Sequence, residues 1–191
     1  MNQQPKQSEA CGARTNVKVT LCRCSTPLAR ALSAAIALAQ RLGLRKLMRR
    51  LLTVYHAQYA VQRLQAANIV PDAALTLLAK AITGNCAALA EIEVDKSALG
   101  TGTAAPVAGD TGLATEVYRK SIASQSYSAN VAYNTAFYTA AEVSGTFKEH
   151  GIFANNATLI SRVLLNAPTG IVKTLTNTLT IEHETTFVFN A

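Results

Sequence analysis

Residues 176–189 have the sequence TNTLTIEHETTFVF, in which polar and apolar side chains alternate along most of the stretch. Successive side chains of a β-strand point to opposite faces of a sheet, so this period of two predicts a strand with one buried face. The residues that would share the buried face are Leu179, Ile181, His183, Thr185, Phe187 and Phe189. Because His183 lies among apolar neighbours, we expect it to be a hydrogen-bonded histidine of the core.

Shorter segments of the same kind precede this strand, with turn residues between them. The predicted strands cover residues 90–94, 117–123, 130–139, 146–153 and 158–165. Residues 100–112 are rich in glycine and contain a proline, which indicates a loop. Several short strands separated by turns are typical of an antiparallel β-sandwich, which we place at residues 87–191.

The residues before this module predict helices. Ser25-Thr26-Pro27 is a helix start signal, and the following residues to about 40 favour a helix. Gly43 indicates a bend or a break, and residues 44–67 have the apolar spacing of an amphipathic helix. Pro71 opens a further helix, which we expect to end near Gly84.

The expected fold class is therefore α+β, in three parts. Residues 1–25 are polar, lack a sustained period and predict an extended arm, whose order would require a docking surface on its own body or on neighbouring subunits. Residues 26–86 form a basic helical region, and residues 87–191 form the β-sandwich.

Charge is distributed unevenly along the 191 residues, whose net charge is +7. Residues 1–90 hold twelve basic against two acidic side chains, a charge of +10, whereas residues 91–191 hold six against nine, a charge of −3. Arg41, Arg45 and Arg49 are spaced by four residues, which predicts one basic ridge, and Lys46 and Arg50 add to it. Docking on an acidic neighbouring subunit is the favoured interpretation, ahead of nucleic-acid backbone contact and of an anionic membrane surface.

The sequence contains no arrangement that we can assign to catalysis, a cofactor or a metal. Gly100, Gly102 and Ala105 have the spacing of a dinucleotide-binding loop, but Pro106 begins more loop where that site requires a helix. The spacing of the cysteines does not fit a zinc site, and reduced thiols are expected. The acidic pairs Glu91/Glu93 and Glu182/Glu184 predict polar outer faces of strands. No apolar run is long enough to cross a membrane.

From about residue 75 to the end, the sequence resembles a family of bacteriophage virion proteins usually described as tail-fibre, baseplate or minor structural proteins. The order and spacing of several segments over about 110 residues carry this resemblance. These segments are LGTGTAAP at 99–106, GDTGL at 109–113, EVYRK at 116–120, AEVSGTF at 141–147, EHGIF at 149–153, SRVLL at 161–165 and KTLTNTLTI at 173–181. The first 65 residues do not share it.

The resemblance implies a β-rich module that assembles into a virion without catalysis. The expected position is the tail, baseplate or neck, and the expected partners are other virion proteins and copies of the chain, first as a trimer and next as a sixfold ring. The alternatives are a head decoration or cement protein and a basic neck protein that contacts packaged DNA. A carbohydrate-binding receptor module is weaker, because it would need an exposed aromatic platform.

The residues of the resembling segments have architectural interpretations. Gly100, Gly102 and Gly109 would allow positive φ angles in a long loop, Pro106 would stiffen it, and Asp110 would cap the turn that follows. Two ion pairs are expected, one between Glu116 and Arg119 and one across strands between Glu149 and Arg162. If buried, such pairs define the register of the strands more than they stabilise them.

Overall fold

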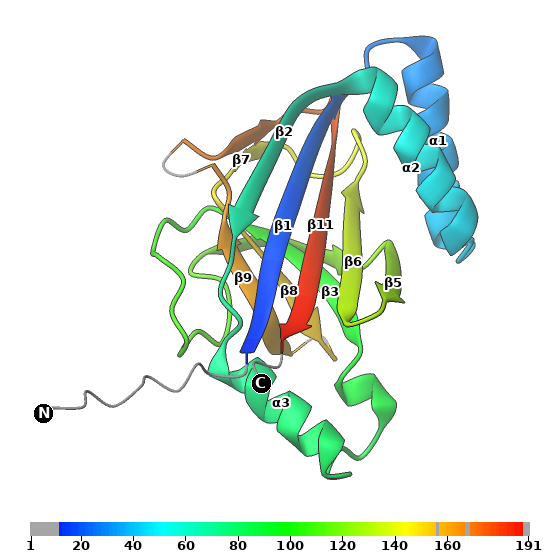
Figure 1. Cartoon of the computed structure of the whole chain (residues 1–191). Coiled ribbons are helices and arrows are strands. Elements are labelled where there is room, and N and C mark those ends of the chain that lie inside the picture. Colours follow the sequence, from blue (N-terminus) through cyan, green and yellow to red (C-terminus); the bar gives the residue numbers. More distant parts are fainter. Residues whose placement is uncertain (1–11, 156, 167–168, 189–191) are drawn as a thin grey trace, which may run out of the picture.

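The computed structural model describes residues 12–155, 157–166 and 169–188 (Figure 1). In this part of the chain there are three α-helices and eleven strands, and the strand pairs are antiparallel, which confirms the α+β class. The helices are α1 (Pro27–Arg41), α2 (Arg45–Tyr59) and α3 (Asp72–Ile82), with a 3-10 turn at Leu89–Glu91. The strands are β1 (Gly12–Arg23), β2 (Ala60–Ala67), β3 (Val94–Gly100), β4 (Glu116–Ser121), β5 (Ser124–Ser128), β6 (Val131–Tyr138), β7 (Gly145–Phe147), β8 (Glu149–Ala154), β9 (Thr158–Leu164), β10 (Ile171–Lys173) and β11 (Asn177–Val188).

Strand β11, the core of the stretch 176–189, lies at the centre of the largest sheet. That sheet has the order β2-β1-β11-β6-β5, a second sheet has the order β4-β3-β8-β9, and β10 pairs with β7. Leu179 and Ile181 of β11 are fully buried in a cluster that also contains Val17 of β1 and Leu99 of β3. The two larger sheets therefore share one hydrophobic core. Phe189, assigned above to the buried face, lies outside the described residues.

The prediction of an arm over residues 1–25 is wrong for residues 12–23, which form strand β1. Val17, Val19 and Leu21 of this strand are buried, and β1 pairs with β11 along its whole length. The alternation in β1 is short, and its partner lies more than 150 residues away in the sequence. Contact with β11 and β2, rather than a local signal, makes this segment a strand. Residues 1–11 lie outside the described residues.

Two further predictions of secondary structure are wrong, and one strand was not predicted. The helix predicted over residues 44–67 ends at Tyr59, because Ala60 is extended (φ −65°, ψ 124°) and the following residues pair with β1 as strand β2. Residues 90 and 91 belong to the 3-10 turn, and the strand begins only at Val94. The serine-rich segment of β5 (Ser124–Ser128) has no apolar alternation, yet it pairs with β6.

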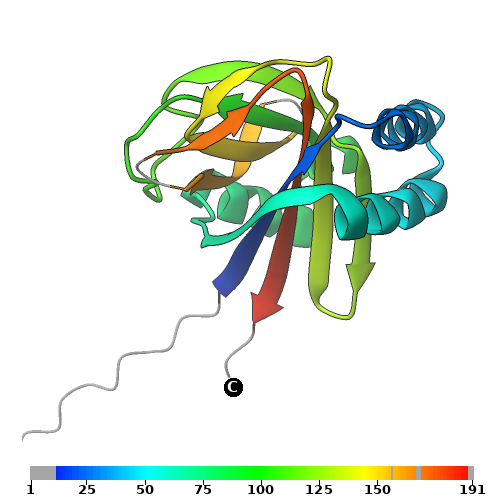
Figure 2. The same ribbon diagram turned by 90° about the horizontal axis from the view of Figure 1, so that it is seen from above.

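The helix boundaries at Thr26, Gly43 and Gly84 are confirmed. Thr26 Oγ1 accepts the N–H of Ala29 at 3.1 Å as an N-cap, while Gly43 and Gly84 have positive φ angles just beyond the ends of α1 and α3. Helices α1 and α2 form a hairpin that packs on the outer face of the five-stranded sheet, where Ile36 and Tyr55 are fully buried. Figure 2 shows this hairpin on one side of the molecule, with the long green loop after β3 on the other. Helix α3 lies near the ends of the described chain (Figure 1).

Candidate functional site

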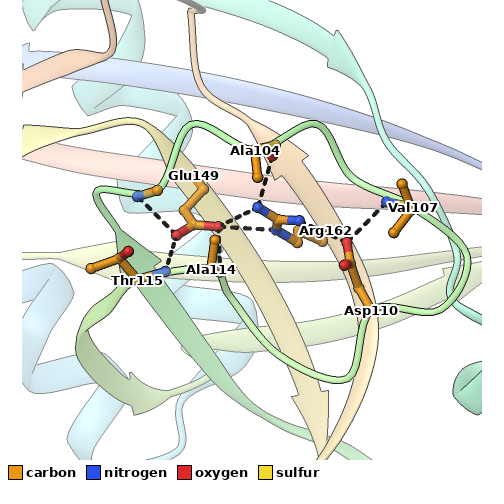
Figure 3. A network of polar contacts seen from close by, with 8 residues as sticks. Ala104, Val107, Asp110, Ala114, Thr115, Glu149 and Arg162 are labelled. Carbon is orange, nitrogen blue, oxygen red and sulfur yellow. Dashed lines mark hydrogen bonds and ion pairs between the residues drawn. The ribbon is translucent and has the colours of Figure 1, made fainter.

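The loop that joins β3 to β4, residues 101–115, is held by a buried ion pair (Figure 3). Glu149 of β8 is fully buried and Arg162 of β9 is 2% exposed. The guanidinium donates from Nε to Glu149 Oε2 at 2.9 Å, and Nη2 lies 2.9 Å from the same oxygen. The ion pair expected across these strands is therefore formed.

Each partner of this pair also binds the loop backbone. Glu149 Oε1 accepts the N–H groups of Gly102 and Thr115, at 2.9 and 2.7 Å, and Oε2 accepts the N–H of Ala114 at 3.0 Å. The carboxylate thus joins the beginning of the loop to its end. A buried ion pair is stable only when further hydrogen bonds compensate its lost hydration, and these three donors do so. We name this network the loop clamp.

Arg162 holds the middle of the loop. Its Nη2 donates to the carbonyl of Ala104 at 2.9 Å, and its Nη1 donates to Asp110 Oδ2 at 2.7 Å. Burial alone would lower the pKa of Arg162, but its hydrogen bonds to Asp110 and Glu149 outweigh burial and raise it. A raised pKa keeps the guanidinium charged within the loop clamp.

Asp110 caps a turn on the opposite side from the one expected. Its Oδ2 accepts the N–H of Val107 at 2.9 Å, so it closes the turn that precedes it, and the prediction of a cap for the following turn is wrong. Burial favours a raised pKa for Asp110, but the Val107 N–H and the Arg162 guanidinium outweigh burial and lower it. Asp110 therefore stays ionised as the second carboxylate on Arg162.

Two glycines at the start of the loop let neighbouring groups approach the backbone closely, and they do not have positive φ angles. Gly43, Gly84, Gly145 and Gly170 are the glycines with positive φ among the described residues, so that prediction is wrong for Gly100, Gly102 and Gly109. A Cβ at Gly102 would lie 2.3 Å from Glu149 Oε1, and one at Gly100 would lie 2.5 Å from the carbonyl oxygen of Thr115. A Cβ at Gly109 would meet nothing within 4 Å. Two of the three glycines make room for the clamp, and Pro106 lies in the same loop.

A more exposed ion pair lies beside the loop. Arg119 donates from Nε and Nη2 to the two carboxylate oxygens of Glu116, at 2.8 and 2.6 Å, so this expected pair is also formed. The hydrogen bond to Glu116 raises the pKa of Arg119, and its guanidinium lies 3.8 Å from the centre of the Phe153 ring. Lys120 pairs with Glu142 at 2.7 Å, a contact the sequence pattern did not indicate.

A second buried polar cluster crosses from one large sheet to the other. The Nδ1 atom of His150 lies 2.7 Å from Nε2 of His183, and the Nε2 atom of His150 lies 2.8 Å from Oγ of Ser97. His183 Nδ1 lies 2.9 Å from Ser161 Oγ, and Tyr138 and Asn68 extend the chain through Ser97 and Ser161. We name these six residues the histidine chain. His183 is a hydrogen-bonded core residue, as predicted, but its partner His150 was missed because the two lie 33 positions apart.

Both imidazoles of the histidine chain are neutral near pH 7. Each is fully buried. Burial lowers the pKa of His183 to about 3, and burial together with the charge of a protonated His183 lowers the pKa of His150 well below its ordinary value. Neutral imidazoles have one donor and one acceptor nitrogen each, so both can take part in a single run of hydrogen bonds between serine hydroxyls.

The hairpin of α1 and α2 presents a basic surface, but not the continuous ridge predicted. Arg41 ends α1 and Arg45 begins α2 on the other side of the Gly43 turn, so Arg41 does not continue the row of Arg45 and Arg49. The four-residue spacing of a helix was applied across the break at Gly43, where it does not hold. The exposed cations of residues 41–50, which we name the hairpin tip, are Arg41, Arg45, Lys46, Arg49 and Arg50.

Two grooves of similar size flank β5. The first, the α3 groove, has a volume of about 690 Å³ and is mainly apolar. Its lining includes Leu75, Leu78, Ile92, Tyr127, Phe187 and Arg45. The second groove, about 700 Å³, lies between α2 and the outer face of the five-stranded sheet and is lined by polar residues that include Lys18, Arg49, His56 and Glu182.

The acidic pairs and the cysteines have structural surroundings. Glu91 lies in the 3-10 turn and Glu93 precedes β3, so the prediction that they share a strand face is wrong. Glu184 of β11 binds Lys18 of the neighbouring strand at 2.5 Å. Cys22, Cys24 and Cys86 are free thiols, whereas Cys11 lies outside the described residues.

Within the described ranges, no group of three or more His, Cys, Asp or Glu side chains could hold a metal ion. None of the described helices is both long and apolar enough to cross a membrane. Comparison of the chain with protein-family models, with curated proteins and with solved structures finds no match to any of them. The candidate functional features are therefore those of the chain itself: the loop clamp, the histidine chain, the hairpin tip and the α3 groove.

Proposed function

We propose that this protein is a structural component of a bacteriophage virion that works by protein–protein assembly and performs no catalysis. Its place would be the tail, baseplate or neck, where it would act as an adaptor or fibre attachment. The two large sheets would form a β-sandwich that serves as the rigid body. The resemblance of residues 75–191 to phage virion proteins supports this proposal.

The observation that carries the proposal is the surface of the hairpin tip. Leu42, Leu44 and Leu47 are 62%, 46% and 48% exposed, and they lie among five cations. Residues 27–59 contain no acidic side chain. Clustered apolar side chains with a charged fringe are typical of protein interaction sites, because water contact with them is unfavourable and the charges select the partner.

The loop clamp supports a mechanical role for the body. Its central carboxylate is fully buried and receives three N–H groups and a guanidinium, so it is committed to holding the loop. Val107 at the surface of that loop is 55% exposed. A loop of this length held at its beginning, middle and end presents a fixed surface, which an assembly protein requires.

This proposal has two alternatives, the first also a structural role and the second a DNA-binding role. One is a decoration or cement protein on the capsid surface, which would also use a rigid β-rich body and an exposed apolar patch. The other is a basic neck protein that contacts packaged DNA, and the five cations of the hairpin tip favour it. DNA would neutralise these cations but would leave the leucines between them in water, so we favour a protein partner.

Copy number and position in purified virions test the proposal. Quantitative mass spectrometry should find three or six copies per particle, and antibody-gold labelling should place them on the tail axis. Hundreds of copies across the capsid lattice would instead indicate the decoration protein, and absence from virions would overturn the proposal.

Titration of the full chain with duplex DNA at several salt concentrations tests the alternative. A logarithm of the binding constant that falls steeply and linearly with the logarithm of the salt concentration would indicate phosphate contacts by the hairpin tip. If the hairpin tip binds protein and not DNA, charge-neutral variants of Lys46 and Arg50 should impair assembly. Their affinity for DNA should equal that of the wild type, because the wild type has no specific DNA affinity to lose.

A further inference from the structure

The α3 groove has the properties that the hairpin tip requires of a partner. Leu75, Leu78 and Ile82 lie three and four positions apart, so they form one stripe along α3. Their exposed fractions are 46%, 40% and 79%, and Ala74 is the buried residue of this helix. A helix that is apolar on several sides is normally covered, so this stripe indicates an absent neighbour.

The charges of the two surfaces are opposite. Residues 72–95, which form α3 and the rim that follows it, contain four carboxylates against the single cation Lys80. The charged residues that line the groove are the exposed Glu93 and Arg45, and Arg45 belongs to the hairpin tip of the same chain. The hairpin tip contains five cations and no carboxylate. Opposite charges around apolar centres favour this pairing and disfavour contact of tip with tip or groove with groove.

We propose that the hairpin tip of one copy of this chain docks in the α3 groove of a second copy. This inference rests on the proposed function, because it names the partner of the same hairpin surface. A second copy covers the exposed leucines of both surfaces and pairs their charges, whereas a polyanion would satisfy the charges alone. The groove volume of about 690 Å³ lies within the range of about 300–1,000 Å³ in which sites enclose a compact group of side chains or a small ligand.

The position of Arg45 defines how such copies would assemble. This residue belongs to the hairpin tip and also lines the α3 groove of its own chain, so the two surfaces lie side by side on one molecule. A contact between two different surfaces repeats head to tail, and it gives a ring when the rotation from one copy to the next closes and an open filament when it does not. The trimer and the sixfold ring expected from the sequence are closed forms of such a contact.

Charge exchange in the full chain tests the contact. The tip variant combines Arg41→Glu with Lys46→Glu, the groove variant is Glu93→Lys, and Arg23→Glu changes the charge of an exposed strand residue away from both surfaces. Light scattering after size exclusion should find a ring for wild type and for Arg23→Glu. The tip variant and the groove variant should each dissociate at concentrations at least tenfold higher than wild type, because each substitution replaces an attractive charge at the contact with a repulsive one.

A chain that combines the tip and groove substitutions should regain the ring. Every tip then meets an exchanged groove, so the charge pairs at positions 46 and 93 are restored in a ring of any size. Circular dichroism of each variant shows whether it is folded, and zero-length cross-linking of mixed ¹⁴N and ¹⁵N wild-type chains should join Lys46 to Glu93 in hybrid peptides.

Two outcomes would overturn the inference. A wild-type ring that all variants retain would mean that another surface joins the copies, and the proposed function would then stand without this contact. A monomeric wild-type chain without hybrid cross-links would exclude the contact outright. The copy number in virions is measured separately, so failure of the docking contact and failure of the virion role are distinguishable.

Discussion

The loop clamp and the histidine chain compensate the burial of polar groups in opposite ways. In the clamp, Glu149 and Arg162 form an ion pair, and backbone N–H groups and a carbonyl complete their hydrogen bonds. In the histidine chain, His150 and His183 are neutral and share hydrogen bonds with two serine hydroxyls. The comparison shows that the stability of a buried charge depends on all of its hydrogen-bond partners together. The stability of a buried neutral histidine depends on pH, because the imidazole must stay unprotonated.

The largest effect is expected from removal of one charge of the clamp. Glu149→Gln leaves the buried Arg162 guanidinium with a neutral amide in place of one of its two carboxylates, the fully buried one, and should lower the free energy of unfolding by about 3–5 kcal/mol. Urea denaturation measures this change. The double variant Glu149→Gln with Arg162→Met should lose less than the two single losses together. Strict additivity would show that the two side chains do not act as a pair.

The histidine chain should make stability sensitive to acid. Its histidines have lowered pKa values in the folded protein, so the unfolded chain binds more protons, and stability is complete above pH 6.5 and falls as pH decreases toward 3. With a folded-state pKa of about 3, the buried His183 should cost about 2 kcal/mol at pH 5 relative to pH 7, and His150 acts with the same sign.

The difference between wild type and His183→Gln isolates this effect. Carboxylates titrate in the same pH range, and burial also lowers the pKa of His56 to about 4, so His56 likewise makes stability fall as the pH decreases. The variant should be less stable at pH 7 but should lose about 2 kcal/mol less than wild type between pH 7 and pH 5. Parallel pH profiles of the two proteins would contradict neutral burial of His183.

Close approach in the clamp predicts a smaller effect at Gly102. In Gly102→Ala the added Cβ would displace Glu149 Oε1, and we expect a loss of about 1–3 kcal/mol in thermal or urea unfolding. Gly109→Ala is the matched control, because its Cβ would meet nothing within 4 Å and its φ is not positive. It should be neutral or slightly stabilising. Equal losses at both positions would mean that loop flexibility, not space beside Glu149, requires glycine.

The smallest effect is expected at the exposed ion pair, which sharpens the contrast with the clamp. Glu116 and Arg119 have side chains that are 29% and 27% exposed, so water already screens their attraction. Glu116→Gln should change the free energy of unfolding by about 0.2–1 kcal/mol, less at high salt. A loss as large as that of Glu149→Gln would show that solvent access does not separate the two pairs.

Local patterns in the sequence determined the elements whose signals lie within a few residues. The alternation of Leu179, Ile181 and His183 predicted β11, and Thr26 and Gly43 predicted the ends of α1, because capping and burial of one face are local properties. The sequence also indicated two ion pairs. Glu116 and Arg119 lie three positions apart, and Glu149 and Arg162 lie on strands that were expected to be neighbours.

Only the tertiary structure decided what depends on residues far apart in the chain. Residues 60–67 have a helical apolar spacing yet form β2, because pairing with β1 satisfies their backbone groups. Gly102 requires glycine because of the Glu149 carboxylate, 47 positions away, and not because of its own φ angle. His150 and His183 meet only when the two large sheets pack. Propensity and period act over a few residues, whereas close approach and desolvation depend on which distant side chains the fold brings into contact.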